Sequence, residues 1–111
     1  SDFVWLLGDI SYADGHQRKW DRYGRAVEPL YSSIPVLAVV GNHEEEWNEF
    51  EAYDMRWRHP DKEEERYWFS VANGPVLTFS LSSEHDFRPV SKQYEWLERL
   101  LQDANESGRR K

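Results

Sequence analysis

Two stretches of this chain carry most of its structural information: Gly8-Asp9-Ile10-Ser11-Tyr12-Ala13-Asp14 and Gly41-Asn42-His43-Glu44. Each stretch directly follows an apolar run, residues 3–7 in the first case and residues 34–40 in the second. Short continuous apolar runs are typical of strands that are buried on both faces of a sheet. Because ligands of open α/β sheets gather at the carboxyl ends of strands, the polar side chains of both stretches are expected at one sheet edge.

The segment between the two strands is expected to be a helix. Residues 16–31 place aromatic and aliphatic side chains at helical spacing, at Trp20, Tyr23, Val27, Leu30 and Tyr31. A strand, a helix and a second strand in this order predict a right-handed crossover and two parallel neighbouring strands.

The rest of the chain predicts two more helices and a β-hairpin. A helix is expected over residues 45–57, ended by His59-Pro60, with inner positions at Trp47, Phe50, Tyr53 and Met55. Residues 61–66 are expected to form a charged loop, and strands are expected at residues 67–71 and 76–81 around the turn residues Ala72-Asn73-Gly74-Pro75. The last helix is expected over residues 91–105, begun by Ser91 and followed by Gly108, with an inner face of Tyr94, Leu97, Leu100, Leu101 and Ala104.

The composition excludes several classes of protein. The chain has 111 residues, which is room for at most one domain, and 15% of them are aromatic, so a packed core is expected. A formal net charge of -7 argues against nucleic-acid binding, although bound cations still allow an acidic protein to bind phosphate. No apolar run approaches the ~18 residues that a membrane span needs. Cysteine is absent, which excludes disulfides and thiolate metal sites.

Four side chains of the two stretches suit a metal site that binds phosphate. The carboxylate of Asp9 can bridge two cations, and the amide oxygen of Asn42 can bind one. A tyrosine phenolate is a hard anionic ligand that suits a trivalent metal, and Tyr12 follows Asp9 closely enough to turn back to the same point. His43 is expected above the metals, where it would meet a substrate phosphate.

Simpler interpretations stay open for the same residues. A Gly-Asp pair after a strand often only caps a turn, and Tyr12 taken alone is more often a packed aromatic residue. Four acids are expected by default to be solvated loop charges or acids at a helix N-terminus: Asp14, Glu44, Glu45 and Glu46.

The two stretches together resemble the purple acid phosphatases, the tyrosine-bearing branch of the calcineurin-like metallophosphoesterases. They are similar to the second and third metal-binding motifs of that family. The similarity continues through Trp20-Asp21-x-x-Gly24-Arg25, Ser82-Ser83-Glu84-His85-Asp86-Phe87 and Gln93-Tyr94-x-Trp96-Leu97. It therefore covers nearly the whole chain.

This resemblance implies an α/β fold, namely part of a four-layer αββα sandwich, and the expected hairpin over residues 67–81 indicates that the sheet is mixed. Residues 1–111 would then be an incomplete catalytic domain, because the family's Asp-x-Gly motif would lie upstream and its strand-His and Gly-His-x-His motifs downstream. His16, His59 and His85 do not match those missing motifs, and His85 is interpreted as a loop residue.

By the same resemblance, Asp9 bridges two metal ions and Tyr12 binds Fe(III), which gives the family its purple charge-transfer colour. Asn42 would bind the divalent metal, which is zinc, manganese or iron, and His43 would contact the substrate phosphate and assist the leaving group. The implied activity is that of an acid phosphatase, in which a metal-bound hydroxide attacks a phosphate monoester in line with the leaving group. The chain by itself is expected to show little or no activity.

Two alternatives accompany this interpretation. One is a metallophosphoesterase of another branch that acts on diesters or nucleotides, and the other is a non-catalytic scaffold that uses its 6 Trp and 6 Tyr as a binding surface. The resemblance also implies a secreted or vacuolar location, where the sequon Asn105-Glu106-Ser107 would accept a glycan.

Overall fold

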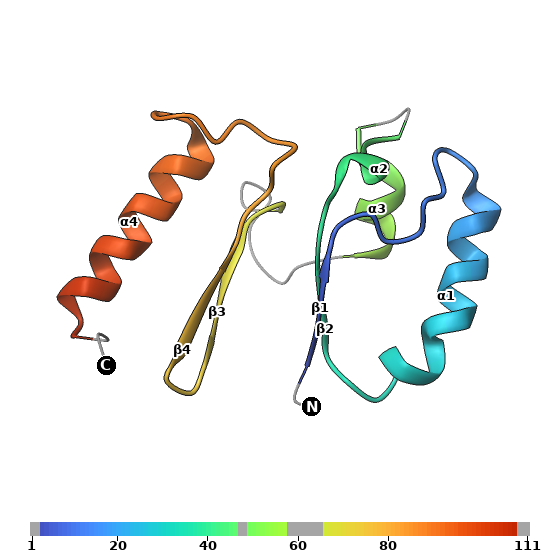
Figure 1. The fold of residues 1–111 in the computed structure, drawn as a ribbon, viewed down its shortest axis with the longest axis horizontal. Coiled ribbons are helices and arrows are strands. Elements are labelled where there is room, and N and C mark those ends of the chain that lie inside the picture. The colour runs from blue at the N-terminus through green and yellow to red at the C-terminus, as the bar shows by residue number, and fades with distance from the viewer. Residues whose placement is uncertain (1–2, 47–48, 58–65, 109–111) are drawn as a thin grey trace. The chain divides into compact units, whose positions relative to one another are not determined.

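The computed structural model describes residues 3–46, 49–57 and 66–108 (Figure 1). The chain forms two compact units, Ser1–Pro60 and Asp61–Lys111, and each unit is described by itself. The first unit contains β1, α1, β2, α2 and α3, and the second contains β3, β4 and α4. Within the described ranges, no helix is both long and apolar enough to cross a membrane.

The first unit is built on two parallel strands. β1 (Val4–Leu7) pairs with β2 (Val36–Val39), in a register that matches Leu7 with Val39 at the carboxyl ends. The connecting helix α1 (Gln17–Tyr31) runs back alongside the strands (Figure 1), so the predicted strand–helix–strand unit is confirmed. The expected burial on both faces fails at the end of β1, because Leu7 is 81% exposed.

The face that α1 buries agrees with its sequence spacing. Trp20 is buried and belongs to a core cluster with Ala13 and Ala52. Three further residues of the expected face are partly buried or lie at its edge: Tyr23, Val27 and Tyr31. Leu30 is largely exposed, so its expected inner position is wrong.

The segment after β2 differs from the prediction. It forms two short helices, α2 (Asn42–Glu45) and α3 (Glu51–Arg56), where one helix over residues 45–57 was expected. The backbone between them is left-handed at Glu46, Glu49 and Phe50, with φ angles of 46°, 47° and 69°. A right-handed helix cannot continue through such residues, which is the physical reason for the break.

Two of the expected inner positions of this segment are confirmed. Phe50 and Tyr53 are buried, and the Tyr53 hydroxyl donates a hydrogen bond to the Ala38 carbonyl oxygen at 3.0 Å. Met55 is 69% exposed, because α3 restarts in a register of its own, so its inner position is wrong. Trp47, His59-Pro60 and residues 61–65 lie outside the described residues.

The second unit begins with the predicted hairpin. β3 (Phe69–Asn73) and β4 (Val76–Ser80) are antiparallel, with Phe69 opposite Ser80 and Asn73 opposite Val76. Only Gly74 and Pro75 form the turn, so β3 starts and ends two residues later than predicted. Gly74 has a φ of 58°, the positive value that tight two-residue hairpin turns require.

The last helix, α4 (Lys92–Glu106), has the predicted N-cap, because the Ser91 hydroxyl accepts a hydrogen bond from the Tyr94 N–H at 3.2 Å. Its inner face agrees only in part with the predicted one, because three of the five expected residues are partly buried: Leu97, Leu100 and Ala104. Gln93 and Trp96 are the buried residues of the helix, while Tyr94 and Leu101 are largely exposed. The reason is a polar anchor: the Gln93 amide pairs with both backbone groups of Ser82, at 2.7 and 2.9 Å.

The described elements combine a parallel strand pair, an antiparallel hairpin and helices, which confirms the α/β class.

Candidate metal centre

The two sequence motifs lie side by side, because β1 and β2 end at the same level. Gly8 follows β1 with a φ of 80°, and a Cβ at this position would lie 2.7 Å from the Gly41 nitrogen and 2.8 Å from its Cα. Real Cβ atoms do not approach backbone this closely, so glycine at position 8 permits the contact of the two strand ends. The topology therefore produces the common sheet edge that the sequence predicts.

Gly41 leaves the space that the Asp9 carboxylate occupies. A Cβ at Gly41 would collide with Asp9 Oδ1 and would lie 2.8 Å from the Asp9 nitrogen. The absence of a side chain at Gly41 thus lets Asp9 turn across the end of the neighbouring strand.

Three of the four predicted site residues converge at this point. The Tyr12 hydroxyl donates to Asp9 Oδ2 at 3.3 Å, and the His43 backbone N–H donates to Asp9 Oδ1 at 3.3 Å. The rings of Tyr12 and His43 lie 4.4 Å apart between centroids. Asn42 stands directly between Gly41 and His43 as the first residue of α2, and its side chain is exposed.

The loop that carries these residues is strained. Asp9, Tyr12 and Asp14 have φ angles of 51°, 49° and 49°, in the left-handed region that side chains other than glycine disfavour. Each such residue costs on the order of 1 kcal/mol or more and persists only where its surroundings hold it. The strain therefore coincides with the convergence of the site residues.

Asp14 orients His43. The Asp14 Oδ1 lies 2.6 Å from His43 Nδ1, and since a carboxylate only accepts, we assign the shared proton to Nδ1. This hydrogen bond raises the pKa of His43 and outweighs the opposing effect of burial. Asp14 is exposed, as expected, but it is not merely a solvated charge, so that part of the sequence interpretation is wrong.

Tyr12 is 52% exposed, and the nearby Asp9 carboxylate raises the pKa of its phenol. The phenol is therefore protonated in the chain as it stands, and a cation that bound here would have to displace that proton.

Glu44 is the site residue that sequence reasoning missed. It is 0% exposed, and its carboxylate accepts hydrogen bonds from three backbone N–H groups: Asp9 at 2.7 Å, Ile10 at 2.7 Å and Gly41 at 2.8 Å. Burial raises the pKa of Glu44, and the three N–H donors oppose that shift. Of the two default expectations, the acid at a helix N-terminus is confirmed, because Glu44 lies in the first turn of α2, three residues after the N-cap Gly41, while the solvated loop charge is wrong.

Glu46 is also not a free charge, because it accepts a hydrogen bond from the Trp20 indole N–H at 2.7 Å. Glu45 is exposed, as expected.

Comparison with known proteins identifies the family. The sequence profile described as Calcineurin-like phosphoesterase matches residues 1–110. The chain belongs to this family.

Relatives of the chain within this family are purple acid phosphatases by name, which confirms the resemblance found in the sequence. "Probable purple acid phosphatase 20" of Arabidopsis thaliana is 41% identical over 109 residues, which cover 90% of this chain and 26% of that protein. "Probable inactive purple acid phosphatase 27" of the same plant is 30% identical over 114 residues, covering 90% of this chain and 19% of that protein.

A solved structure agrees with the fold. The purple acid phosphatase isolated from yellow lupin (Lupinus luteus) seeds matches with a TM-score of 0.81 and 28% identity, over 91% of this chain and 20% of that one. The chain thus spans about a quarter or less of the length of these phosphoesterase relatives.

The donor set of this family member fits part of a metal centre. Within the ranges described, no group of three or more His, Cys, Asp and Glu side chains is arranged to hold a metal ion. Among the predicted metal ligands, only Asp9 is one of these four residue types, and the other two ligands are the side-chain oxygens of Tyr12 and Asn42. The contact of the Tyr12 oxygen with the Asp9 carboxylate brings two hard oxygen donors to one point, as a hard cation requires.

The remaining histidines have other roles. His16 is the N-cap residue of α1, and His85 lies 2.8 Å from the Ser82 hydroxyl and stacks on Tyr67 with centroids 4.2 Å apart. The interpretation of His85 as a loop residue agrees with this packing. His59 lies outside the described residues.

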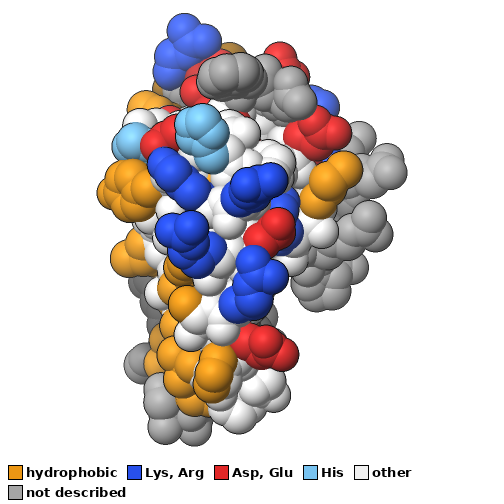
Figure 2. All heavy atoms as spheres, turned by 90° about the vertical axis from the view of Figure 1, so that its right-hand side faces the viewer, with side chains coloured by type: hydrophobic (Ala, Val, Ile, Leu, Met, Phe, Trp, Pro, Cys, Tyr) orange, Lys and Arg blue, Asp and Glu red, His pale blue; other side chains and the backbone are white. Residues whose placement is uncertain are grey.

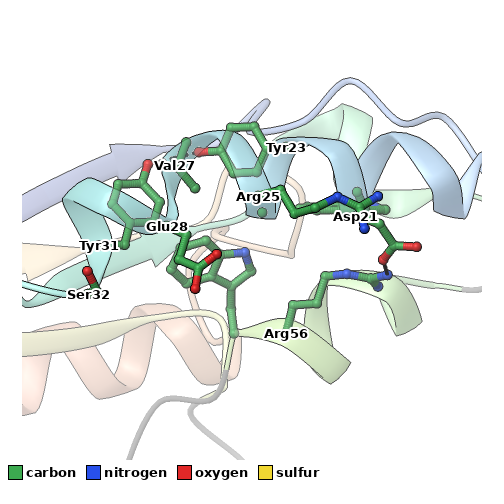
Figure 3. A pocket seen from close by; sticks show the side chains of 11 residues that line it. Asp21, Tyr23, Arg25, Val27, Glu28, Tyr31, Ser32 and Arg56 are labelled. Carbon is green, nitrogen blue, oxygen red and sulfur yellow. Dashed lines mark hydrogen bonds and ion pairs between the residues drawn. The ribbon is translucent and has the colours of Figure 1, made fainter.

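A hollow of about 570 Å³ between α1 and α3 is not part of the candidate centre. Its walls include the aromatic side chains of Trp20, Tyr23, Tyr31 and Trp57. Figure 3 shows Arg56 reaching toward Asp21 beside this hollow, where the two form an ion pair at 3.3 Å. The sequence carried no signal of this hollow.

Proposed function

We propose that the native full-length protein is an acid phosphatase that hydrolyses phosphate monoesters, and that residues 1–111 are part of its catalytic domain. In this proposal Asp9 would hold both Fe(III) and a divalent metal, Tyr12 would hold Fe(III), and Asn42 would hold the divalent metal. The observation that carries the proposal is the convergence of the Tyr12 hydroxyl and the His43 N–H on the Asp9 carboxylate. When bound, the two cations supply an activated water and neutralise charge that develops on the phosphoryl group.

His43 is the proposed catalytic residue of this chain. Its Nδ1–H is held by Asp14, which leaves Nε2 for the substrate. The raised pKa favours the protonated ring, and a protonated ring can donate to a phosphate oxygen or to the leaving group. Asp14 therefore acts through His43.

The charge next to the site supports an anionic substrate. The outward face of α1 carries the exposed residues Arg18, Lys19, Arg22 and Arg25, and Figure 2 shows Lys and Arg side chains gathered on this face. The Lys19 ammonium donates to the Tyr12 carbonyl oxygen at 3.4 Å, so the basic face begins next to the site loop. Such a face attracts phosphate esters although the whole chain is acidic.

A non-catalytic role is the second candidate, because one of the relatives is named as probably inactive. One hydrolysis assay distinguishes the acid phosphatase from the non-catalytic protein, and it also tests the alternative of a phosphodiesterase. The full-length protein with Fe(III) and Zn²⁺ is offered p-nitrophenyl phosphate and bis(p-nitrophenyl) phosphate. We expect faster hydrolysis of the monoester, and His43→Gln should lower kcat by about 100-fold or more.

His16→Gln is the matched control, since His16 is an exposed histidine outside the centre, and its kcat should stay within about twofold. Faster hydrolysis of the diester would favour the other branch of the family. A metal-loaded protein that hydrolyses neither substrate would favour the non-catalytic scaffold.

A secreted location is part of the same proposal. Asn105 is exposed in the last turn of α4, where a glycosyltransferase can reach it. Glycopeptide mapping of the native protein should find a glycan at this residue, and an unmodified Asn105 in protein from its natural source would count against secretion.

A further inference from the structure

Glu44 is the most deeply buried ionisable carboxylate of the described residues, and its placement is unusual for a charged group. Burying a carboxylate is unfavourable unless hydrogen bonds compensate for the lost water. Here three backbone N–H groups do so, all at 2.7 to 2.8 Å. Glu44 therefore occupies a site in the fold that is shaped for its two oxygens.

The three donors belong to both strand-end loops. Asp9 and Ile10 follow β1, whereas Gly41 follows β2. Glu44 Oε2 accepts from Asp9 and Gly41, and Oε1 accepts from Ile10. One side chain thus ties the backbone that carries Asp9 to the backbone that carries Asn42.

The hydrogen bond from the Asp9 N–H to Glu44 also affects where the Asp9 side chain lies. The Asp9 backbone is fixed by Glu44 while its carboxylate lies where a Cβ of residue 41 would be. The strained φ angles of Asp9 and Tyr12 require such an external constraint, and the Glu44 hydrogen bonds supply it at Asp9.

We infer that Glu44 is a positioning residue of the candidate metal centre, which sets the distance and direction between the Asp9 and Asn42 ligands without touching a metal. This inference rests on the proposed function. Loss of a residue that holds metal ligands in place without touching the metal typically weakens metal binding by about 10- to 100-fold.

The test compares Glu44→Gln with Glu46→Gln in the full-length protein. Both changes remove one carboxylate and keep the shape of the side chain, and both glutamates accept hydrogen bonds from N–H groups. Glu44 accepts them from the backbone of the two strand-end loops, whereas Glu46 accepts one from the Trp20 indole. A glutamine at position 44 can place its oxygen toward Asp9 and Gly41, and its amide then opposes the Ile10 N–H. Amide exchange at Ile10 in the metal-free protein should therefore accelerate at least tenfold in Glu44→Gln and stay unchanged in Glu46→Gln.

The functional measurement is the affinity for Zn²⁺, determined by competition with a chelator. We expect Glu44→Gln to weaken it about 10- to 100-fold, with Glu46→Gln within about twofold of the unmodified protein. Equal Zn²⁺ affinity in all three proteins, or equal losses in both variants, would overturn the inference. If Glu44→Gln does not fold, amide exchange in the unmodified protein decides. The inference would be overturned if the amides of Asp9, Ile10 and Gly41 exchanged as fast as the amide of an exposed loop residue.

The two proposals fail in different ways. A protein that binds Zn²⁺ but hydrolyses no phosphate ester contradicts the proposed function and leaves the Zn²⁺ comparison intact. A protein that hydrolyses monoesters, with Zn²⁺ affinity unaffected by Glu44→Gln, contradicts only the role of Glu44.

Discussion

At the scale of single residues, the Asp9 carboxylate packs directly against the backbone of Gly41 at the strand ends. Gly41 has no side chain, and the Asp9 carboxylate fills the place where a Cβ would be. Gly24 in α1 differs sharply, because a Cβ added there would meet no heavy atom within 4 Å.

Alanine should lower activity at Gly41 and raise stability at Gly24. Gly41→Ala displaces Asp9, so we expect kcat/KM for p-nitrophenyl phosphate to fall at least tenfold. Gly24→Ala removes a glycine from a helix interior and should raise the free energy of unfolding by about 0.5–1 kcal/mol, with activity unchanged. Steady-state kinetics and thermal unfolding measure both effects, and an active Gly41→Ala variant would contradict the placement of Asp9.

Asp14→Asn should lower the pKa of His43, because the hydrogen bond that His43 Nδ1–H donates to Asp14 is the largest cause of its upward shift. A raised folded-state pKa stabilises the protein below the ordinary histidine value of about 6.5, and this contribution is lost as the pH rises through the folded pKa. The variant should therefore show a weaker decline of stability over that range. NMR titration of the His43 ring in the metal-free protein gives the pKa directly.

Asp21→Asn is the matched control for this titration, since Asp21 pairs with Arg56 and is not among the groups that shift the pKa of His43. An unchanged His43 pKa in Asp14→Asn, or an equal change in both variants, would contradict the assignment of Asp14 as the partner of His43.

The sequence predicted which residues converge but not how they are held. Asp9, Tyr12 and His43 could be placed together because strand ends and motif spacing are visible in the sequence. The partners of Glu44 and Glu46 could not be predicted, because a run of three acids in a sequence indicates either solvated charges or a helix N-terminus, and only the folded chain reveals which acid meets a backbone N–H or an indole.

At the scale of elements, the helices and strands with a periodic pattern or a continuous apolar run were predicted, and the break between α2 and α3 was not. α1, β2 and α4 have clear periodicity or continuous apolar runs. The break between α2 and α3 has no Gly or Pro to announce it, and it depends on left-handed residues such as Glu49 and Phe50. Tertiary contacts, among them the Trp20–Glu46 hydrogen bond, hold that conformation against local preference.

The inner face of α4 was predicted only in part, because a buried glutamine such as Gln93 looks like a surface residue in a sequence. Gln93→Leu keeps the size of the side chain and removes both hydrogen bonds to Ser82. The Ser82 N–H and carbonyl would then be buried without partners, and we expect a loss of about 2–4 kcal/mol of unfolding free energy. Gln102→Leu, on the exposed side of α4, should change it by less than about 0.5 kcal/mol.

Chemical denaturation of the two variants measures this difference. A Gln93→Leu protein as stable as Gln102→Leu would show that the Gln93–Ser82 pair does not hold α4 against the hairpin segment.

At the scale of the whole molecule, the family and the α/β class could be predicted because motifs and strand runs cover most of the chain. The exposure of Leu7 at the end of β1 was not predicted, since an apolar run does not reveal which of its residues other elements cover. The chain spans 26% of the Arabidopsis relative named probable purple acid phosphatase 20, so activity is a property to be measured on the native full-length protein.

The most direct measurement is the visible absorption spectrum of the iron-loaded full-length protein, recorded with metal analysis, for the unmodified protein and for Tyr12→Phe. Tyr94→Phe is the control, because Tyr94 is an exposed tyrosine on α4, outside the candidate centre. We predict a charge-transfer band that disappears in Tyr12→Phe and persists in Tyr94→Phe. An iron-loaded protein without this band, or a band that survives Tyr12→Phe, would contradict the assignment of Asp9 and Tyr12 to a metal centre containing Fe(III).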